Sequence, residues 1–169
     1  MTVSLSPGTL EAIRATPSVL RALLGDVPED VAATTGLEGW SPRDVVAHLV
    51  VAGRLGALDR ASRALGDEGA SFAGYDEEGE LDASGLRGEP VAALLRLLEA
   101  ERAGCLVLTR TLEGDDLARS GVHEDVGQVT VAELLHQAAY HDSLHIAQIA
   151  SLLSASFMAG RGALATAQS

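Results

Sequence analysis

Lysine is absent from this sequence of 169 residues, and cysteine and aromatic side chains are scarce. The one cysteine, Cys105, excludes an internal disulfide, and its place in a helical apolar pattern indicates a small core residue. Only five residues are Trp, Tyr or Phe, although 47% of the chain is hydrophobic. The core therefore has to consist mostly of Leu, Val, Ile and Ala, which favours packed helices over a sandwich of aromatic and β-branched strands.

Long apolar runs are missing too. No stretch approaches the ~18–20 residues that a membrane-spanning helix needs. The N-terminus has no basic segment followed by an apolar stretch, as a secretory signal would have. A chain of this length is most simply one domain. We therefore expect a single-domain cytoplasmic protein that does not insert into a membrane.

The charge is strongly one-sided. There are 24 acidic residues against 12 basic ones, all arginine, which gives a net charge of −12. This balance would repel a phosphate backbone, and no basic cluster stands out to offset it. We expect no contact with nucleic acid and look for a small-molecule substrate instead.

Start and stop signals divide the chain into four main helices. The first ends near Gly25, and Thr16-Pro17 predicts an interruption within it. Ser41-Pro42 supplies a capping hydroxyl and a first-position proline for a second helix that runs to about Leu65. Pro90 opens the third helix. A T-x-x-E capping box at residues 130–133 starts a last helix that runs to about Ser156.

Residues 66–89, between the second and third helices, are rich in glycine and acid and have no period. Such a stretch is either disordered or a functional crossover. Its residues Phe72, Tyr75 and Asp76 are candidates for a lid or substrate wall, and the alternative is an ordinary solvated connection. The sequence thus predicts an all-α fold, a four-helix bundle with a long crossover between helices 2 and 3. The bundle domain covers residues 1–158, and residues 159–169 are expected to form a flexible tail.

Two histidines four residues apart mark the last helix. On a helical wheel His141 and His145 lie at the edge of the apolar arc, one turn apart, so both imidazoles can converge on one point. His136 lies about 180° from His145 and is expected at the surface or an interface. The spacing is that of the H-E-x-x-H protease signature. However, Asp142 is one methylene short for the general base, and no ligand residue follows His145.

A third ligand must therefore come from upstream, where His48 and His123 are the remaining histidines. His48 lies in an apolar helix, VVAHLVV, where a single histidine is more often a hydrogen-bonded core residue. Two further inward-facing imidazoles change that balance, because a divalent cation would satisfy all three at once. The spacing favours a metal site formed by His48, His141 and His145.

The sequence leaves two alternative roles for each of Asp142 and His123. Asp142 lies inside the apolar arc, where a lone carboxylate is costly. It either accepts a hydrogen bond from a ligating imidazole or pairs with a group on another helix, such as an arginine. His123 precedes the last helix, in a segment that is loop or a brief extended pairing. It is either a proton carrier near the site or a residue that stabilises its loop.

The combined pattern resembles the DinB/YfiT-like superfamily. The resemblance is carried by Trp40-Ser-Pro-Arg-Asp-Val-Val-Ala-His-Leu, the long connection, Gly127-Gln-Val-Thr-Val-Ala-Glu, and His-Asp-x-x-His-Ile-Ala-Gln-Ile from His141. It implies a four-helix bundle, often dimeric, in which His48, His141 and His145 match the three metal ligands. The metal is expected to be zinc or nickel. Several related enzymes use low-molecular-weight thiols.

Three functions follow as hypotheses. The leading one is a metal-dependent enzyme that uses a low-molecular-weight thiol as co-substrate, either an S-transferase or an isomerase. The second is a metal-dependent hydrolase, in which Asp142 or His123 assists proton transfer to or from the water. The third is a non-catalytic, metal-stabilised stress or binding protein. The resemblance also implies a homodimer.

Overall fold

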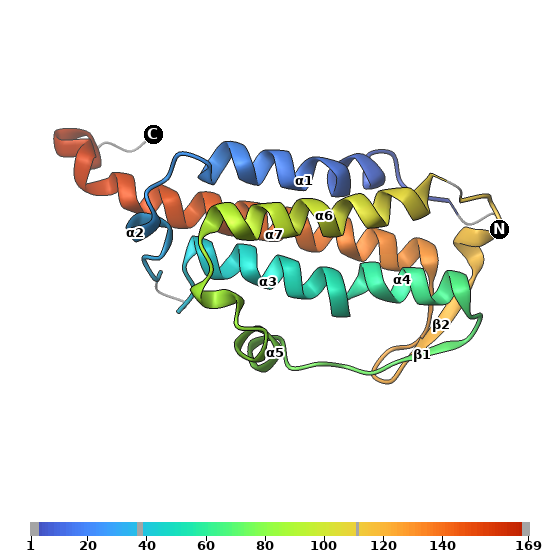
Figure 1. The fold of residues 1–169 in the computed structure, drawn as a ribbon. Coiled ribbons are helices and arrows are strands. Elements are labelled where there is room, and N and C mark those ends of the chain that lie inside the picture. The colour runs from blue at the N-terminus through green and yellow to red at the C-terminus, as the bar shows by residue number, and fades with distance from the viewer. Residues whose placement is uncertain (1–3, 37–38, 111, 167–169) are drawn as a thin grey trace.

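The computed structural model describes residues 4–36, 39–110 and 112–166. Its long helices lie side by side along a common axis, and a small sheet covers one end (Figure 1). This arrangement confirms the predicted all-α four-helix bundle. The long helices are α1 (Thr9–Leu24), α3 (Pro42–Leu55) followed by α4 (Ala57–Gly66), α6 (Val91–Thr109) and α7 (Val131–Phe157). The shorter elements are α2 (Glu29–Ala32), α5 (Glu77–Ala83), the 3-10 helices η1 (Leu86–Gly88), η2 (Asp116–Ala118) and η3 (Met158–Thr166), and strands β1 (Ala70–Phe72), β2 (Ser120–His123) and β3 (Gly127–Thr130).

Each long helix packs on two neighbours. Helix α1 contacts α6 and α7, while α3 contacts α6 and α7 from the other side, with α4 continuing along α7. The buried side chains are mainly aliphatic, as the shortage of aromatic residues predicts. One core cluster includes Leu49, Leu94 and Ile149, and a second one includes Phe72 and Leu135.

Two helices begin where their capping boxes predict. The Ser41 hydroxyl accepts from the Asp44 backbone N–H at 3.2 Å, and the Asp44 carboxylate accepts from the Ser41 N–H at 2.9 Å. Thr130 and Glu133 make the same reciprocal pair at the start of α7. These bonds satisfy amides that have no partner within the helix, so they fix the starts of α3 and α7.

The predicted interruption at Thr16-Pro17 is wrong, because α1 runs through both residues. A proline within a helix loses its own N–H bond and crowds the carbonyl four residues earlier. Both Thr16 and Pro17 are buried, and the Thr16 hydroxyl donates to the Ala12 carbonyl at 3.0 Å. Burial of Ile13, Leu20 and other residues on the same face offsets the local cost.

The second predicted helix is divided. Gly56 ends α3, and α4 begins at the next residue. A Cβ at position 56 would lie 2.6 Å from the Ala52 carbonyl oxygen and 3.3 Å from the Tyr75 hydroxyl. The break therefore requires a residue without a side chain, and it brings the crossover against the helix at this point.

The crossover between α4 and α6 is ordered, so the disordered alternative for residues 66–89 is wrong. It contains β1, α5 and η1. Strand β1 pairs in parallel with β2, and β2 pairs antiparallel with β3. The segment around His123 is therefore an extended pairing rather than a loop. A short helix, α2, also forms within the connection between α1 and α3, where the sequence analysis predicted no helix.

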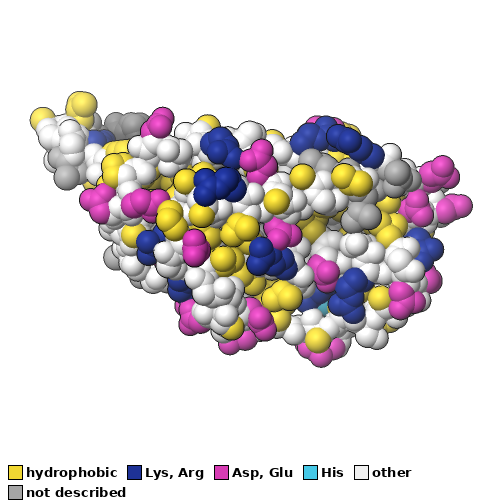
Figure 2. All heavy atoms as spheres, in the orientation of Figure 1, with side chains coloured by type: hydrophobic (Ala, Val, Ile, Leu, Met, Phe, Trp, Pro, Cys, Tyr) yellow, Lys and Arg dark blue, Asp and Glu magenta, His cyan; other side chains and the backbone are white. Residues whose placement is uncertain are grey.

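On the face seen in Figure 2, arginine side chains lie among acidic ones.

Among the described residues, no single helix has the length and apolarity to cross a membrane. Only α7 together with Gly160–Thr166, across a bend of 100°, meets both criteria. Helix η3 contains a break at Gly162, with φ 53°. The flexible tail over residues 159–169 stays a prediction.

Candidate metal centre

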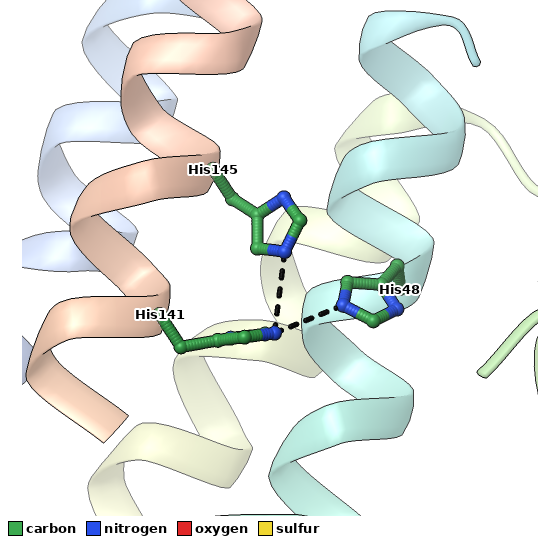
Figure 3. A group of neighbouring side chains, drawn as sticks. All are labelled: His48, His141 and His145. Atoms are coloured by element: carbon green, nitrogen blue, oxygen red, sulfur yellow. Dashed lines mark hydrogen bonds between the residues drawn. The ribbon is translucent and has the colours of Figure 1, made fainter. Parts of the chain in front are cut away.

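Three imidazoles from two helices meet inside the bundle. His48 comes from α3, and His141 and His145 come from successive turns of α7 (Figure 3). The Nε2 atom of His141 lies 3.0 Å from that of His48 and 3.2 Å from that of His145. One ligand atom from each residue lies within 4.8 Å of the others. The structure thus brings together the three histidines that the sequence singled out.

These separations fit a metal ion. Two imidazole nitrogens that bind one tetrahedral zinc ion at 2.0–2.1 Å lie about 3.3 Å apart. The alternative, in which each histidine is an independently hydrogen-bonded core residue, fits less well. The Nδ1 atom of His48, whose side chain has no solvent exposure, has no hydrogen-bond partner among the described residues. The Trp40 ring packs edge-on against His48, with centroids 5.1 Å apart.

The electrostatics keep the imidazoles of His48 and His141 neutral. Burial, with smaller contributions from His145 and His141, lowers the pKa of His48 to about 3. Burial and then His145 lower the pKa of His141 to about 4, although Asp142 acts in the opposite direction. A neutral imidazole offers a free lone pair, and this is the form that binds metals. At neutral pH the cluster is therefore ready to bind a cation.

His145 is oriented by Gln148, a residue of the same helix that the sequence analysis did not single out. Its Nδ1 donates to the Gln148 side-chain oxygen at 2.8 Å. The proton on Nδ1 leaves Nε2 with its lone pair directed at the other imidazoles. Outer hydrogen bonds of this kind fix the tautomer and ring orientation of ligating histidines. His145 and Gln148 are three residues apart on α7, and this spacing places two side chains close together on a helix, so the contact could have been predicted from the sequence.

The lowered pKa values predict how the metal-free protein responds to acid. His48 and His141 titrate near 6.5 when the chain is unfolded and below that when it is folded, so between about pH 4 and pH 6.5 the unfolded state binds more protons. We expect stability to be full above pH 6.5 and to fall below it by roughly 1–3 kcal/mol per pH unit. Urea unfolding at pH 6.5, 6.0 and 5.5 with a chelator present measures the slope.

The control for this prediction is the double variant His48→Gln, His141→Gln. It lacks both titrating imidazoles, so its stability is expected to change much less over the same pH interval. An equally steep slope in the double variant would assign the acid sensitivity to other groups.

Asp142 realises the second of its two predicted roles. It is buried, and both of its oxygens accept from Arg102 on α6, at 2.7 Å from Nη2 and 3.0 Å from Nε. No hydrogen bond joins its carboxylate to a described histidine. With both oxygens engaged by a guanidinium, Asp142 is not placed to accept a proton from a nucleophile at the cluster.

His123 and two of the crossover candidates lie elsewhere. The His123 Nδ1 accepts from the Asp125 backbone N–H at 3.2 Å, which stabilises the β2–β3 turn. Phe72 is buried in the second core cluster, so it is not a substrate wall. Asp76 caps α5 by accepting from the Glu78 N–H. His136 accepts from the Ser6 N–H, away from the cluster.

Tyr75 is the crossover candidate that does reach the site. It lines a cavity of about 150 Å³ that also has His141 in its wall. The cavity lies between α3, α4, α7 and the crossover. Its lining comprises Ala52, Gly56, Ala57, Leu58, Arg60, Tyr75, Glu77, Arg102, Leu134, Gln137, Ala138, His141 and Asp142. A compartment for a small molecule therefore adjoins the histidine cluster.

Known proteins share both the sequence pattern and the fold. The model of the DinB superfamily matches residues 12–149. A protein of Bacillus cereus, named for an inferred metal-dependent hydrolase activity, is 34% identical over 116 residues, which are 68% of this chain and 65% of that protein. A similarly named protein of Oceanobacillus iheyensis is 30% identical over the same shares. This chain thus spans slightly less than two thirds of the relatives it matches.

Two solved structures have the same fold. YfiT from Bacillus subtilis, described as a metal-dependent hydrolase by inference and as having an unusual four-helix bundle topology, superposes with a TM-score of 0.79 at 23% identity, covering 88% of each chain. A mycothiol-dependent maleylpyruvate isomerase superposes with a TM-score of 0.66 at 19% identity, covering 83% of this chain and 59% of the isomerase.

Proposed function

The chain belongs to the DinB superfamily, and from that premise we propose that it is a metal-dependent enzyme whose divalent ion is held by His48, His141 and His145. The convergence of three Nε2 atoms, two of them on imidazoles kept neutral by burial, carries the proposal. Imidazole ligands suit zinc and nickel among the common divalent ions. Three protein ligands also leave a coordination position open for a substrate or nucleophile.

The bound ion would supply Lewis acidity and lower the pKa of a water or thiol nucleophile. The residues of the chain do the rest. Gln148 and Trp40 hold His145 and His48 in orientation. The cavity beside His141 is large enough for a small substrate, and the phenol of Tyr75 lies in its wall. Burial, followed by the nearby Glu77 carboxylate, raises the pKa of Tyr75, so the phenol stays a hydrogen-bond donor at neutral pH.

Hydrolysis, the second of the sequence-based hypotheses, is the reaction we favour. Its support is the name shared by relatives at 30–34% identity. Thiol transfer or isomerisation is the other candidate, and it is favoured by the mycothiol-dependent isomerase that shares the bundle. The two differ in one requirement, since only the second needs a thiol.

We expect the zinc- or nickel-loaded protein to hydrolyse activated esters or amides without added thiol. Activity should disappear on chelation, return with the ion, and be absent from His141→Ala. The measurement is turnover of nitrophenyl esters and anilides beside a parallel assay of thiols with an electrophilic acceptor. Turnover only in the thiol assay would replace hydrolysis by the thiol reaction. If neither assay shows turnover and chelation only lowers thermal stability, the protein is a non-catalytic metal-binding protein.

A further inference from the structure

One arginine in the cavity wall has no acidic partner. The Nη2 atom of Arg60, on α4, donates to the Ala73 carbonyl at 2.7 Å, and its guanidinium lies 5.6 Å from the centre of the Tyr75 ring. No ion pair joins Arg60 to a carboxylate in the part of the chain that the structure describes. The other arginine of the wall, Arg102, is neutralised by Asp142. Arg60 is therefore a cation that is held in place but has no ion-pair partner among the described residues.

Neutral donors stand beside this cation. The Tyr75 hydroxyl lies in the same wall and makes no hydrogen bond with a described residue, and the Gln137 amide also lines the cavity. A wall with several unused N–H and O–H donors favours a ligand rich in acceptor atoms.

We propose that this cavity binds the carboxylate of a small organic acid, with Arg60 as its cationic partner and Tyr75 as a second donor. The inference rests on the proposed function, because it places the other end of the acid at His141 and the metal. Guanidinium and carboxylate match in charge and in hydrogen-bond geometry. A 150 Å³ cavity accepts a molecule about the size of benzene, so the acid is one of about three to six carbons.

The same helix offers a matched control. Arg63, one turn after Arg60, donates to the Ser71 carbonyl at 2.6 Å and lies 5.1 Å from the centre of the Phe72 ring. Both arginines thus tie α4 to the crossover by one carbonyl bond and one aromatic contact. Only Arg60 lines the cavity. A loss of crossover stability would appear in both variants, whereas a loss of ligand binding would appear in one.

A carboxylate in the cavity wall provides a second control, whose expected effect on ligand affinity is opposite to that of an Arg60 substitution. Glu77 lines the cavity and has an exposed side chain. Its negative charge opposes an anionic ligand and would attract a cationic one. Removing the charge with Glu77→Gln should therefore tighten the binding of an acid slightly. Removing the charge of Arg60 should weaken it.

The test uses butyrate and butyramide, which are close in size and differ in charge. Each is titrated into zinc-loaded protein and followed by NMR chemical shifts. We expect butyrate to bind more tightly than butyramide, and Arg60→Gln to weaken butyrate by about tenfold or more while changing butyramide less than about twofold. Arg63→Gln should leave both ligands within about twofold of wild type. Arg60→Lys, which keeps the charge but not the fork of donors, should fall between wild type and Arg60→Gln.

Equal effects of Arg60→Gln and Arg63→Gln on butyrate would overturn the proposal, as would butyrate binding that Arg60→Gln leaves unchanged, since the acid would then bind the metal alone. Tighter butyrate binding in Arg60→Gln, or weaker butyrate binding in Glu77→Gln, would also overturn the proposal. Zinc content is measured on the same samples. Full zinc content without carboxylate selectivity refutes only the cavity proposal. Absence of zinc refutes the proposed function, while the ratio of wild type to Arg60→Gln still tests the cavity.

Discussion

His141→Ala is expected to lose the metal ion almost completely. Wild-type protein should retain one divalent ion per chain after dialysis, whereas the variant should bind it about 100-fold more weakly or worse. His141 is the central member of the cluster, because its Nε2 lies within 3.2 Å of both other imidazoles. Removing it leaves only His48 and His145 as ligands of an incomplete site. Elemental analysis of dialysed protein and competition with a coloured chelator measure the change.

His136→Ala is the matched control for this loss. His136 is on the same helix and also uses its Nε2, but that atom accepts a hydrogen bond from Ser6 and lies outside the cluster. The control should keep its ion. Gln148→Leu should fall between the two, with a loss of about 10- to 100-fold, because only the orientation of His145 is disturbed. Equal metal content in wild type and His141→Ala would refute the site.

Local sequence signals predicted most of this centre because they depend on helix geometry alone. A spacing of four residues places His141 and His145 on one face whatever surrounds them. The capping residues Ser41 and Thr130 fix where α3 and α7 begin, and therefore which residues of each helix share a face. His48 was identified because the pair on α7 needs a third ligand from upstream and one divalent cation would satisfy all three imidazoles. Nothing local showed that α3 and α7 would bring the rings to 3.0 Å, and the residue types and the family resemblance were what pointed to it.

The features that sequence reasoning missed depend on contacts between distant segments. Gly56 has the appearance of a small helix residue, and the break there is explained by the approach of the Tyr75 hydroxyl from the crossover. Phe72 and Tyr75 are three residues apart and equally aromatic. One of them points from β1 into the core and the other lines the cavity. Phe72 is the last residue of β1, whereas Tyr75 lies beyond the end of that strand, and no periodic pattern in residues 66–89 revealed the strand.

Asp142 also has a partner that is distant in the sequence, although the helix that carries it was predicted correctly. The wheel placed it correctly among apolar residues and required a partner for it, but could not say which. Its partner, Arg102, is 40 residues away on α6, and the ion pair is almost fully buried. The ion pair connects α6 and α7 at the residue that follows His141.

Breaking this buried pair is expected to produce the largest loss of stability of any charge substitution discussed here. Arg102→Met leaves the Asp142 carboxylate buried without its two donors, and we expect it to lower the free energy of unfolding by about 3–5 kcal/mol. The exposed pair between Arg21 and Glu99 also connects two helices, and Arg21→Met is expected to cost less than about 1 kcal/mol. Urea unfolding of metal-free protein at pH 7 compares the two variants.

The double variant Arg102→Met, Asp142→Leu separates the two ways in which the pair can matter. If the cost of Arg102→Met comes from an unpaired buried charge, removing the carboxylate as well should restore most of the lost stability. Zinc content then decides whether the pair also serves the metal centre, because Asp142 is adjacent to His141 and the pair fixes that turn of α7 against α6. We expect the double variant to bind zinc within about tenfold of wild type, since neither oxygen of Asp142 contacts an imidazole. A double variant that is as unstable as Arg102→Met would instead assign the effect to lost packing of the long arginine side chain.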